Sequence, residues 1–378
     1  MKFTVTLDPP AHEMACEEIA KQLVFLSKDT AFSISPSGDR IEFDAPSETG
    51  ISLKAKVETQ ARRIERVLRG LSRKVIFRST AADRPTFAEP VDLSGVHVLG
   101  TGAVALQGLP LCLFRYFDRI FECLGTRWSA EAMLAPSLIS DRTLARAGYF
   151  RSFPQHVTFA SHLQDAHLEN ADALDLRATD LASPAGCLSP AVCYHVYGLY
   201  ENQAVPETGA VHGVCGKCYR HEGAGASDLR RLWEFTMREL VFLGPPEVVL
   251  ANRDQSIEMI SEILDTHQLA GEIRTASDPF FLAPDALAKT YSQLKSDSKF
   301  EVSLFLSGGE RLAAGSVNYH ADFFGRAFHA SVEPSGTMHS ACVAFGLERW
   351  VYAFLAQHGS DVQRWPDRVR SAPEVRGL

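Results

Sequence analysis

The chain has 378 residues, of which 46% are hydrophobic and 22% charged, a composition typical of a soluble globular enzyme. Its net charge of −8 argues against a general polyanion-binding surface, because nucleic-acid affinity depends largely on clustered Lys and Arg. No apolar run reaches the roughly 18 residues of a membrane span, and the N-terminus is too polar for a signal peptide. The eight cysteines are spread along the chain, which is typical of reduced thiols, so we expect a cytoplasmic protein with no membrane contact.

Residues 1–90 are expected to form a small N-terminal α/β domain. Apolar residues at helical spacing predict helices over His12–Ser27 and Ser52–Leu71, and the second is rich in arginine. Its arginines could contact a phosphate or an acidic partner, but we favour a solvated helix face. A proline-containing linker, Ala81–Asp92, follows. The strands predicted in this domain are Lys2–Leu7, Ala31–Ser35, Arg40–Phe43 and Lys74–Arg78.

Residues 91–378 are expected to form a second, larger domain. It opens with a strongly apolar helix, Pro110–Leu124, and a strand, Trp128–Pro136, that ends in a proline. Such a pair often builds a dimer interface because both elements expose broad apolar surface, although a core helix within the domain explains the pattern equally well. Further predicted elements are a strand over Cys187–Tyr197, helices over Asp254–His267 and Ala286–Leu294, strands over Phe300–Leu306 and within Arg311–Phe324, and a helix over Leu347–Gln357.

A β-hairpin is predicted over residues 214–239, with a glycine-rich turn between its strands. Residues two apart in a strand face the same way, so Arg220 and Glu222 share a face, and so do Phe235 and Glu239 on the returning strand. Arginine, glutamate and an aromatic ring on one face suit a site for a nucleotide and an anion. The alternative is a solvated hairpin held by cross-strand salt bridges.

Three segments together resemble the motifs of a class II aminoacyl-tRNA synthetase catalytic domain. The helix and strand that end at Pro136 resemble motif 1, the dimer motif; residues 219–239 resemble motif 2; and Gly346-Leu347-Glu348-Arg349 resembles motif 3. The resemblance covers roughly residues 100 to 360. It implies an α+β fold, in which an antiparallel sheet is flanked by helices, and a homodimer.

The resemblance also implies the residues that bind ATP. Arg220 would neutralise the α-phosphate and Arg349 would lie near the γ-phosphate, where fixed guanidinium groups stabilise the charge of the transition state. These two are the implied catalytic residues. The strand at Ala313 falls where the family holds ATP and magnesium, but Arg311-Leu312-Ala313-Ala314 replaces the acidic and serine residues of the seryl type, so we expect Mg²⁺ to enter with ATP. The resemblance also implies that Glu222 accepts a hydrogen bond from the adenine amino group and that Phe235 stacks on the adenine ring. Arg231, with Leu232 beside it, would close the motif 2 loop over the nucleotide.

Cys193, Glu239 and Cys342 form a pattern that resembles the atypical, zinc-dependent seryl-tRNA synthetases. It resembles more closely their truncated relatives, the amino acid:[carrier protein] ligases. In that family two thiolates and one carboxylate hold Zn²⁺, and the fourth position takes the amino group of the substrate amino acid, which also places Glu239 beside that substrate. Three protein ligands and one open position are typical of a functional zinc site.

Other uses of these residues stay open in the sequence. Cys215-Gly216-Lys217-Cys218 is a C-x₂-C pair that could join Cys187 and Cys193 in a four-thiolate site, although we favour purely structural roles for Cys187, Cys215 and Cys218. Cys193 and Cys342 could also be buried core residues. The histidines His195, His221 and His320 could supply ligands, but we favour hydrogen-bonded pocket or core positions.

The family resemblance implies activation of a small amino acid, such as glycine or alanine, as aminoacyl-AMP. The amino acid would then pass to the phosphopantetheine thiol of an acyl or peptidyl carrier protein. The acidic net charge and the lack of a long basic coiled coil favour an acceptor other than tRNA. Two alternatives remain: a zinc-dependent amino-acid-adenylating enzyme with another acceptor such as tRNA, and a non-catalytic class II paralogue.

Overall fold

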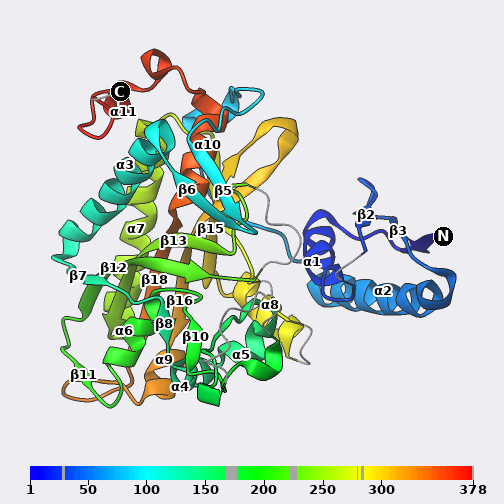
Figure 1. Cartoon of the computed structure of the whole chain (residues 1–378), viewed down its shortest axis with the longest axis horizontal. Helices are drawn as coiled ribbons and strands as arrows, with labels where there is room; N and C mark the ends of the chain where they lie inside the picture. The colour runs from blue at the N-terminus through cyan, green and yellow to red at the C-terminus, as the bar shows by residue number, and fades with distance from the viewer. Residues whose placement is uncertain (28–29, 167–176, 222–227, 279, 282–284, 377–378) are drawn as a thin grey trace. The chain divides into compact units, whose positions relative to one another are not determined.

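The computed structural model contains two compact units (Figure 1). The smaller unit comprises Met1–Val75, Arg151–Pro154 and Arg274–Phe300, and the larger unit comprises the remaining segments. The smaller unit therefore gathers segments that lie far apart in the sequence, and the predicted domain boundary after residue 90 stays a prediction. The structure describes the whole chain except residues 28–29, 167–176, 222–227, 279, 282–284 and 377–378.

The smaller unit is built on a three-stranded antiparallel sheet in the order β1-β3-β2. Its helices bury one apolar stripe each, and Ile19 of the first helix and Ile64 of the second are fully buried in one core. Leu287 and Leu294 of α8 pack into the same core, which explains why a segment near residue 290 belongs to this unit. The bounds are β1 Lys2–Thr6, α1 Glu13–Leu23, β2 Phe32–Ile34, β3 Arg40–Asp44, α2 Ser47–Leu68 and α8 Ala286–Lys295.

The arginine-rich face of α2 is partly neutralised by the helix itself. Arg62 forms an ion pair with Glu58, and Arg69 forms one with Glu65, each across one helical turn. Exposed pairs at this spacing contribute only about 0.3–0.5 kcal/mol. The helix ends before Gly70, whose positive φ of 79° suits a glycine. These contacts agree with the interpretation of α2 as a solvated helix face.

The larger unit is built on an eight-stranded sheet, which is mixed and mostly antiparallel. The motif 2 strands β12 and β13 pair antiparallel without a register shift, and β18 pairs with β13 on its other side. The edge strand β7 runs parallel to β12. The strand order is β4 (Val75–Arg78), β14 (Gly271–Thr275), β15 (Lys299–Phe305), β16 (Arg311–Ala321), β18 (His339–Gly346), β13 (Glu234–Gly244), β12 (Ala210–Tyr219) and β7 (Glu131–Leu134).

Helices cover both faces of this sheet (Figure 1). On one face Arg238 of β13 forms a buried ion pair with Asp118 of α3, and the rings of Phe121 and Phe345 stack at 3.9 Å. On the opposite face Met237 and Val241 of β13 share a core with short helices. The first face carries α3 (Gly108–Leu124), α7 (Pro246–Thr266) and α10 (Leu347–His358), and the second carries α6 (Cys193–Leu199) and α9 (Phe323–Phe328).

The motif 1 helix α3 packs into the core of its own unit. Its residues Leu113, Phe117 and Phe121 are fully buried against the sheet and α10. The following strand, β7, lies at the sheet edge and leaves Leu134 82% exposed, and Leu138 of the nearby strand β8 is 58% exposed. The helix therefore packs as a core helix of its own unit, and the dimer role of motif 1 stays a prediction.

The predicted strand over Cys187–Tyr197 is wrong beyond its first residues. The strand β10 covers only Gly186–Leu188, and Cys193 begins the helix α6. Proline at position 190 cannot donate to a sheet ladder, and the neighbouring Ser189 carbonyl accepts from the Tyr219 amide at the end of β12 instead. The chain therefore turns away from the sheet after Ser189 and re-enters as a helix.

The helix α7 starts two turns earlier than the predicted Asp254. Its first residue is Pro246, a position where the missing N–H costs nothing and the fixed φ favours the helix. None of the helices that the structure describes combines the length and apolar character needed to cross a bilayer. The remaining elements are β5 Val96–Gly100, β6 Ala103–Leu106, β8 Leu138–Ile139, α4 Asp141–Arg146, α5 Tyr149–Ser152, β9 Phe159–Ala160, β11 Ala204–Val205, β17 Ser331–Val332 and α11 Asp367–Arg370.

A buried histidine, His267, follows α7 and makes the folded state less stable in acid. The Nδ1–H of His267 donates to the Ile263 carbonyl at 2.7 Å, so Nε2 accepts from the Tyr116 hydroxyl, also at 2.7 Å. Burial lowers the pKa of His267 from its usual 6.5 to about 4. The unfolded chain therefore binds a proton that the folded chain excludes between these two pH values.

We expect the free energy of unfolding to be highest above pH 6.5 and to fall by about 3 kcal/mol as the pH drops to 4, from this histidine alone. Urea unfolding across that range measures it. His267→Gln should flatten this part of the pH profile, whereas Tyr116→Phe, which keeps the histidine, should lower stability at all pH values and retain the slope. An unchanged slope in His267→Gln would contradict this assignment.

Candidate active site

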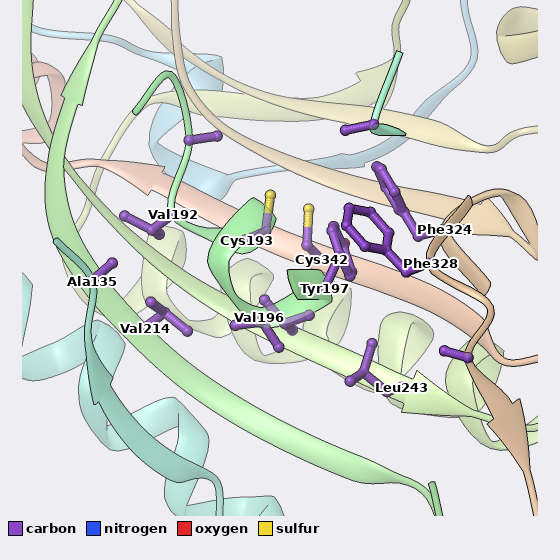
Figure 2. Packing of buried hydrophobic residues seen from close by; sticks show 14 of the residues in the cluster. Ala135, Val192, Cys193, Val196, Tyr197, Val214, Leu243, Phe324, Phe328 and Cys342 are labelled. Carbon is purple, nitrogen blue, oxygen red and sulfur yellow. The ribbon is translucent and has the colours of Figure 1, made fainter. Parts of the chain in front are cut away.

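Cys193, Glu239 and Cys342 meet on the helix-covered face opposite α3. Their ligand atoms, two sulfurs and a carboxylate oxygen, all lie within 4.8 Å of one another. All three side chains are buried, at 7%, 1% and 3% exposure. Figure 2 shows the two sulfur atoms side by side, one from α6 and one from β18. Across the part of the chain that the structure describes, this is the one group of three or more His, Cys, Asp or Glu side chains placed to share a metal ion.

Strand register and a helix start bring these residues together. Glu239 pairs with Ala344 and Val241 pairs with Cys342 across the β13–β18 ladder. Glu239 and Cys342 are thus diagonal neighbours on the same face. Cys193 is the first residue of α6, and the preceding Val192 amide donates to the Glu239 carboxylate at 3.2 Å. The helix that the sequence reasoning missed is what delivers the first cysteine.

Burial and the hydrogen bonds within the cluster shift the pKa values of all three side chains. Burial, and then the Cys342 thiolate, raises the pKa of Glu239 to about 8. The pKa of Cys342 is held well below its usual range by the hydrogen bond from Cys193, with His320 and Asn318 adding to it, while donation of that bond and burial raise the pKa of Cys193. In the metal-free protein these shifts favour protonated Glu239 and Cys193 beside the Cys342 thiolate, and a divalent cation would displace the two protons. Two thiolates and one carboxylate are a donor set that suits Zn²⁺.

The alternative four-thiolate site does not form. Cys215 and Cys218 are three residues apart on β12, an odd spacing that turns their side chains to opposite faces of the sheet. Cys215 lies beside Asp118 on the α3 face, and burial raises its pKa to about 11. Cys218 is buried in the core on the other face, and Cys187 is buried on β10. All eight cysteines are free thiols.

None of the three histidines named from the sequence, His195, His221 and His320, belongs to the three-ligand group. The Nε2 atom of His195 lies 3.1 Å from the Ser189 hydroxyl, and the ring of His221 packs edge-on against Trp233. The interpretation of these two as hydrogen-bonded or packed residues fits these contacts.

Arg220 and Phe235 lie together where the motif 2 hairpin opens. The Arg220 guanidinium carbon is 5.4 Å from the centre of the Phe235 ring, and its Nε donates to the Pro190 carbonyl at 2.9 Å. The Arg220 amide donates to the Trp233 carbonyl, which closes the end of the hairpin ladder. Glu222, which we expect to contact adenine, lies outside the described residues.

Arg349 lies at the start of α10 and reaches across to β16. Its Nη1 donates to the Ala313 carbonyl and its Nε donates to the Arg230 carbonyl, both at 2.8 Å. The structure thus joins the motif 3 arginine both to the strand at Ala313 and to the motif 2 region. Leu232 is buried in the core and Arg231 is exposed, so these neighbours face different surroundings.

One strand carries both a residue expected to bind the nucleotide and a residue expected to bind the metal. Phe235 and Glu239 are four residues apart on β13, which corresponds to about 13 Å along an extended chain. Even spacing keeps both side chains on the same face. The strand therefore connects a guanidinium–aromatic pair at one end with a buried acidic cluster farther along.

Two residues next to the cluster received no defined role from the sequence. Asn318 of β16 donates from Nδ2 to the Cys342 sulfur at 3.4 Å, and the His320 Nε2 atom lies 3.9 Å from the same sulfur. Their alternation along the strand beside β18 is a signal that could have placed them, once the register was known.

Comparison with solved structures defines the class of protein. A seryl-tRNA synthetase of M. kandleri, solved in complex with A. aeolicus tRNASec, aligns over 98% of this chain and 76% of its own, with a TM-score of 0.68 and 20% identity. The synthetase of Pyrococcus horikoshii, complexed with ATP, aligns over 85% of this chain and 80% of its own, with a TM-score of 0.59 and 13% identity. The fold is therefore that of a class II aminoacyl-tRNA synthetase catalytic domain.

Sequence comparison then gives the family. Amino acid--[acyl-carrier-protein] ligases 1 and 2 of Bradyrhizobium diazoefficiens are 32% and 35% identical to this chain, over 66% and 78% of it and 77% and 91% of their own lengths. A type-2 serine--tRNA ligase of Methanococcus aeolicus is 27% identical over 68% of this chain and 53% of its own. No family model matches the chain. The chain belongs to the amino acid--[acyl-carrier-protein] ligase family.

Proposed function

We propose that this protein activates a small amino acid with ATP and transfers it to the phosphopantetheine thiol of a carrier protein. The relatives of highest identity given above are named as ligases of this type. The observation that carries the proposal is the buried Cys193–Glu239–Cys342 cluster on the same sheet face as Arg220 and Phe235. One end of the site can hold a nucleotide, while the other can hold an amino acid through its amine.

In the first step, the carboxylate oxygen of the amino acid attacks the α-phosphorus of ATP and the bond to pyrophosphate breaks. Arg220 stabilises the negative charge that builds on the α-phosphoryl oxygens, and Arg349 holds the departing γ-phosphate end. Phe235 stacks on adenine, while Arg231 and Leu232 form the loop over the nucleotide. The strand at Ala313 offers carbonyls and no acidic side chain, so Mg²⁺ is proposed to enter as the ATP complex.

Cys193, Glu239 and Cys342 would hold a zinc ion at the amino-acid end. When bound, zinc would accept the substrate amine in its neutral form and so select α-amino acids. The Tyr197 and Phe324 rings stack at 3.9 Å beside this cluster and fill the space next to Cys342. Because these rings fill that space, we propose a substrate with a small side chain, such as glycine or alanine.

In the second step, the carrier thiol attacks the carbonyl carbon of the mixed anhydride. The new carbon–sulfur bond replaces the bond to AMP, and the thiol proton is released. The step needs mainly correct positioning of the two reactants. We also propose a homodimer that uses the exposed edge near β7, where Leu134 and Leu138 project.

Amino-acid-dependent ATP–pyrophosphate exchange tests the proposal directly. We expect exchange with glycine or alanine, and its loss after complete zinc removal with recovery on adding Zn²⁺ back. Radiolabelled amino acid should then load a holo-carrier protein and leave tRNA unloaded. The apo-carrier, which lacks the thiol arm, is the matched control.

The alternative functions give different results in the same assays. Loading of tRNA alone would replace the carrier by another acceptor. Binding of ATP with no exchange for any proteinogenic amino acid would indicate the non-catalytic paralogue. Exchange that persists in metal-free protein would contradict the zinc assignment.

A further inference from the structure

The strand β16 presents two hydrogen-bond donors to one ligand of the cluster. Asn318 is the direct cross-strand partner of Cys342, and its Nδ2 group lies 3.4 Å from the cysteine sulfur. The same Nδ2 lies 3.0 Å from the Ser316 hydroxyl oxygen, which fixes the orientation of the amide. The His320 Nε2 atom is 3.9 Å from the Cys342 sulfur on the same side of the strand.

A β-bulge aims His320 at the cysteine. Tyr319 pairs with Ala341 and Ala321 pairs with Ser340, so His320 is the extra, unpaired residue of the ladder. Ala321 takes a positive φ of 49°, an uncommon conformation for a residue other than glycine. Bulges of this kind redirect one side chain and are frequent next to functional sites.

The surroundings of His320 favour one ring tautomer. Its Nδ1 atom lies 3.4 Å from both the Tyr197 and Ser340 hydroxyl groups. A tyrosine hydroxyl keeps its proton at neutral pH and can donate it to Nδ1. The proton of a neutral His320 ring then resides on Nε2, which faces sulfur. Stacking of Tyr197 on Phe324 holds the tyrosine in place.

We propose that Asn318 and His320 are positioning residues that stabilise Cys342 as a metal-binding thiolate, an inference that rests on the proposed zinc site. Two thiolates and one carboxylate carry one negative charge more than Zn²⁺ neutralises. The hydrogen-bond donors on β16 disperse that excess negative charge and fix the rotamer of Cys342. Groups that support metal ligands in this way typically contribute 10- to 100-fold in metal affinity.

The test measures metal binding rather than turnover. Asn318→Leu and His320→Phe remove one donor each while keeping similar bulk. We expect each to weaken Zn²⁺ binding by about 10- to 100-fold in chelator competition. In Co²⁺-substituted protein, loss of a hydrogen bond raises the energy of the sulfur lone pairs, so the sulfur-to-cobalt charge-transfer band should shift to longer wavelength. His320→Gln, whose Nε2 can still donate, should recover most of both effects.

His339→Phe is the matched control. His339 lies on β18 and bonds to the Tyr319 hydroxyl through Nδ1 at 2.6 Å, so the variant removes a histidine–tyrosine contact between the same two strands. It should leave zinc affinity and the cobalt band unchanged. Wild-type affinity and an unshifted band in both Asn318→Leu and folded His320→Phe would overturn the inference alone. A wild-type protein that binds no metal would overturn the zinc site itself, and the inference with it.

Discussion

Replacing Cys342 with alanine is expected to remove bound zinc and to lower amino-acid-dependent exchange by more than about 100-fold, the upper end of the losses caused by changes behind the ligands. The physical reason is that the cluster would keep one thiolate and one carboxylate, too few to hold Zn²⁺ with an open position. Metal content by elemental analysis and exchange rates measured on the same preparation test it.

Cys215→Ala is the control for this prediction. Cys215 is another sheet cysteine, three residues before the buried Cys218, but its sulfur faces Asp118 on the opposite side of the sheet. This variant should keep both zinc and exchange. Equal loss of zinc from the two variants would favour a different thiolate cluster and contradict the assignment of Cys342.

Arg220→Gln is expected to lower the rate constant for adenylate formation by about 10²- to 10³-fold with little change in zinc content. Its guanidinium is the side chain held at the opening of the motif 2 hairpin by the Pro190 carbonyl and the Phe235 ring. Loss of the charge removes stabilisation that develops mainly in the transition state. Single-turnover pyrophosphate release, followed at saturating ATP, separates this effect from weaker ATP binding.

Two further variants, Arg220→Lys as a partial rescue and Arg62→Gln as a surface control, accompany this prediction. The lysine variant keeps a positive charge but lacks the planar fork, so it should recover only part of the rate. Arg62 lies on the surface of α2 and pairs with Glu58, and its replacement should leave the rate unchanged. A wild-type rate in Arg220→Gln would remove this arginine from the reaction.

Motif 2 and motif 3 were predictable because their positions depend on local strand alternation. Strand alternation places Glu239 on the same face as Phe235 and Glu234 on the opposite face, and the β13 ladder confirms that parity. Cys342 lies on the strand that ends at Gly346, the first residue of motif 3. In each case the chain between the reference point and the residue is a single regular element.

Features that depend on contacts between distant segments were missed. The helical start at Cys193 depends on Pro190 and on Ser189 bonding to the end of β12, which periodicity alone does not show. The roles of Asn318 and His320 depend on the β16–β18 register and its bulge. The smaller unit includes the region around α8 because leucines far along the sequence complete its core.

The strand β13 fixes the spacing between the two halves of the proposed site. Phe235 and Glu239 are separated by a fixed number of strand residues, so the distance between the proposed adenine and metal positions is set by backbone geometry rather than by side-chain packing. Substitutions at either end would change one binding function and leave the other intact. A single insertion or deletion between them would instead turn Glu239 toward α3 and separate the two halves of the site in one step. We therefore expect proteins of this fold to change their amino-acid substrate through substitutions near Glu239, while the length of this strand stays constant.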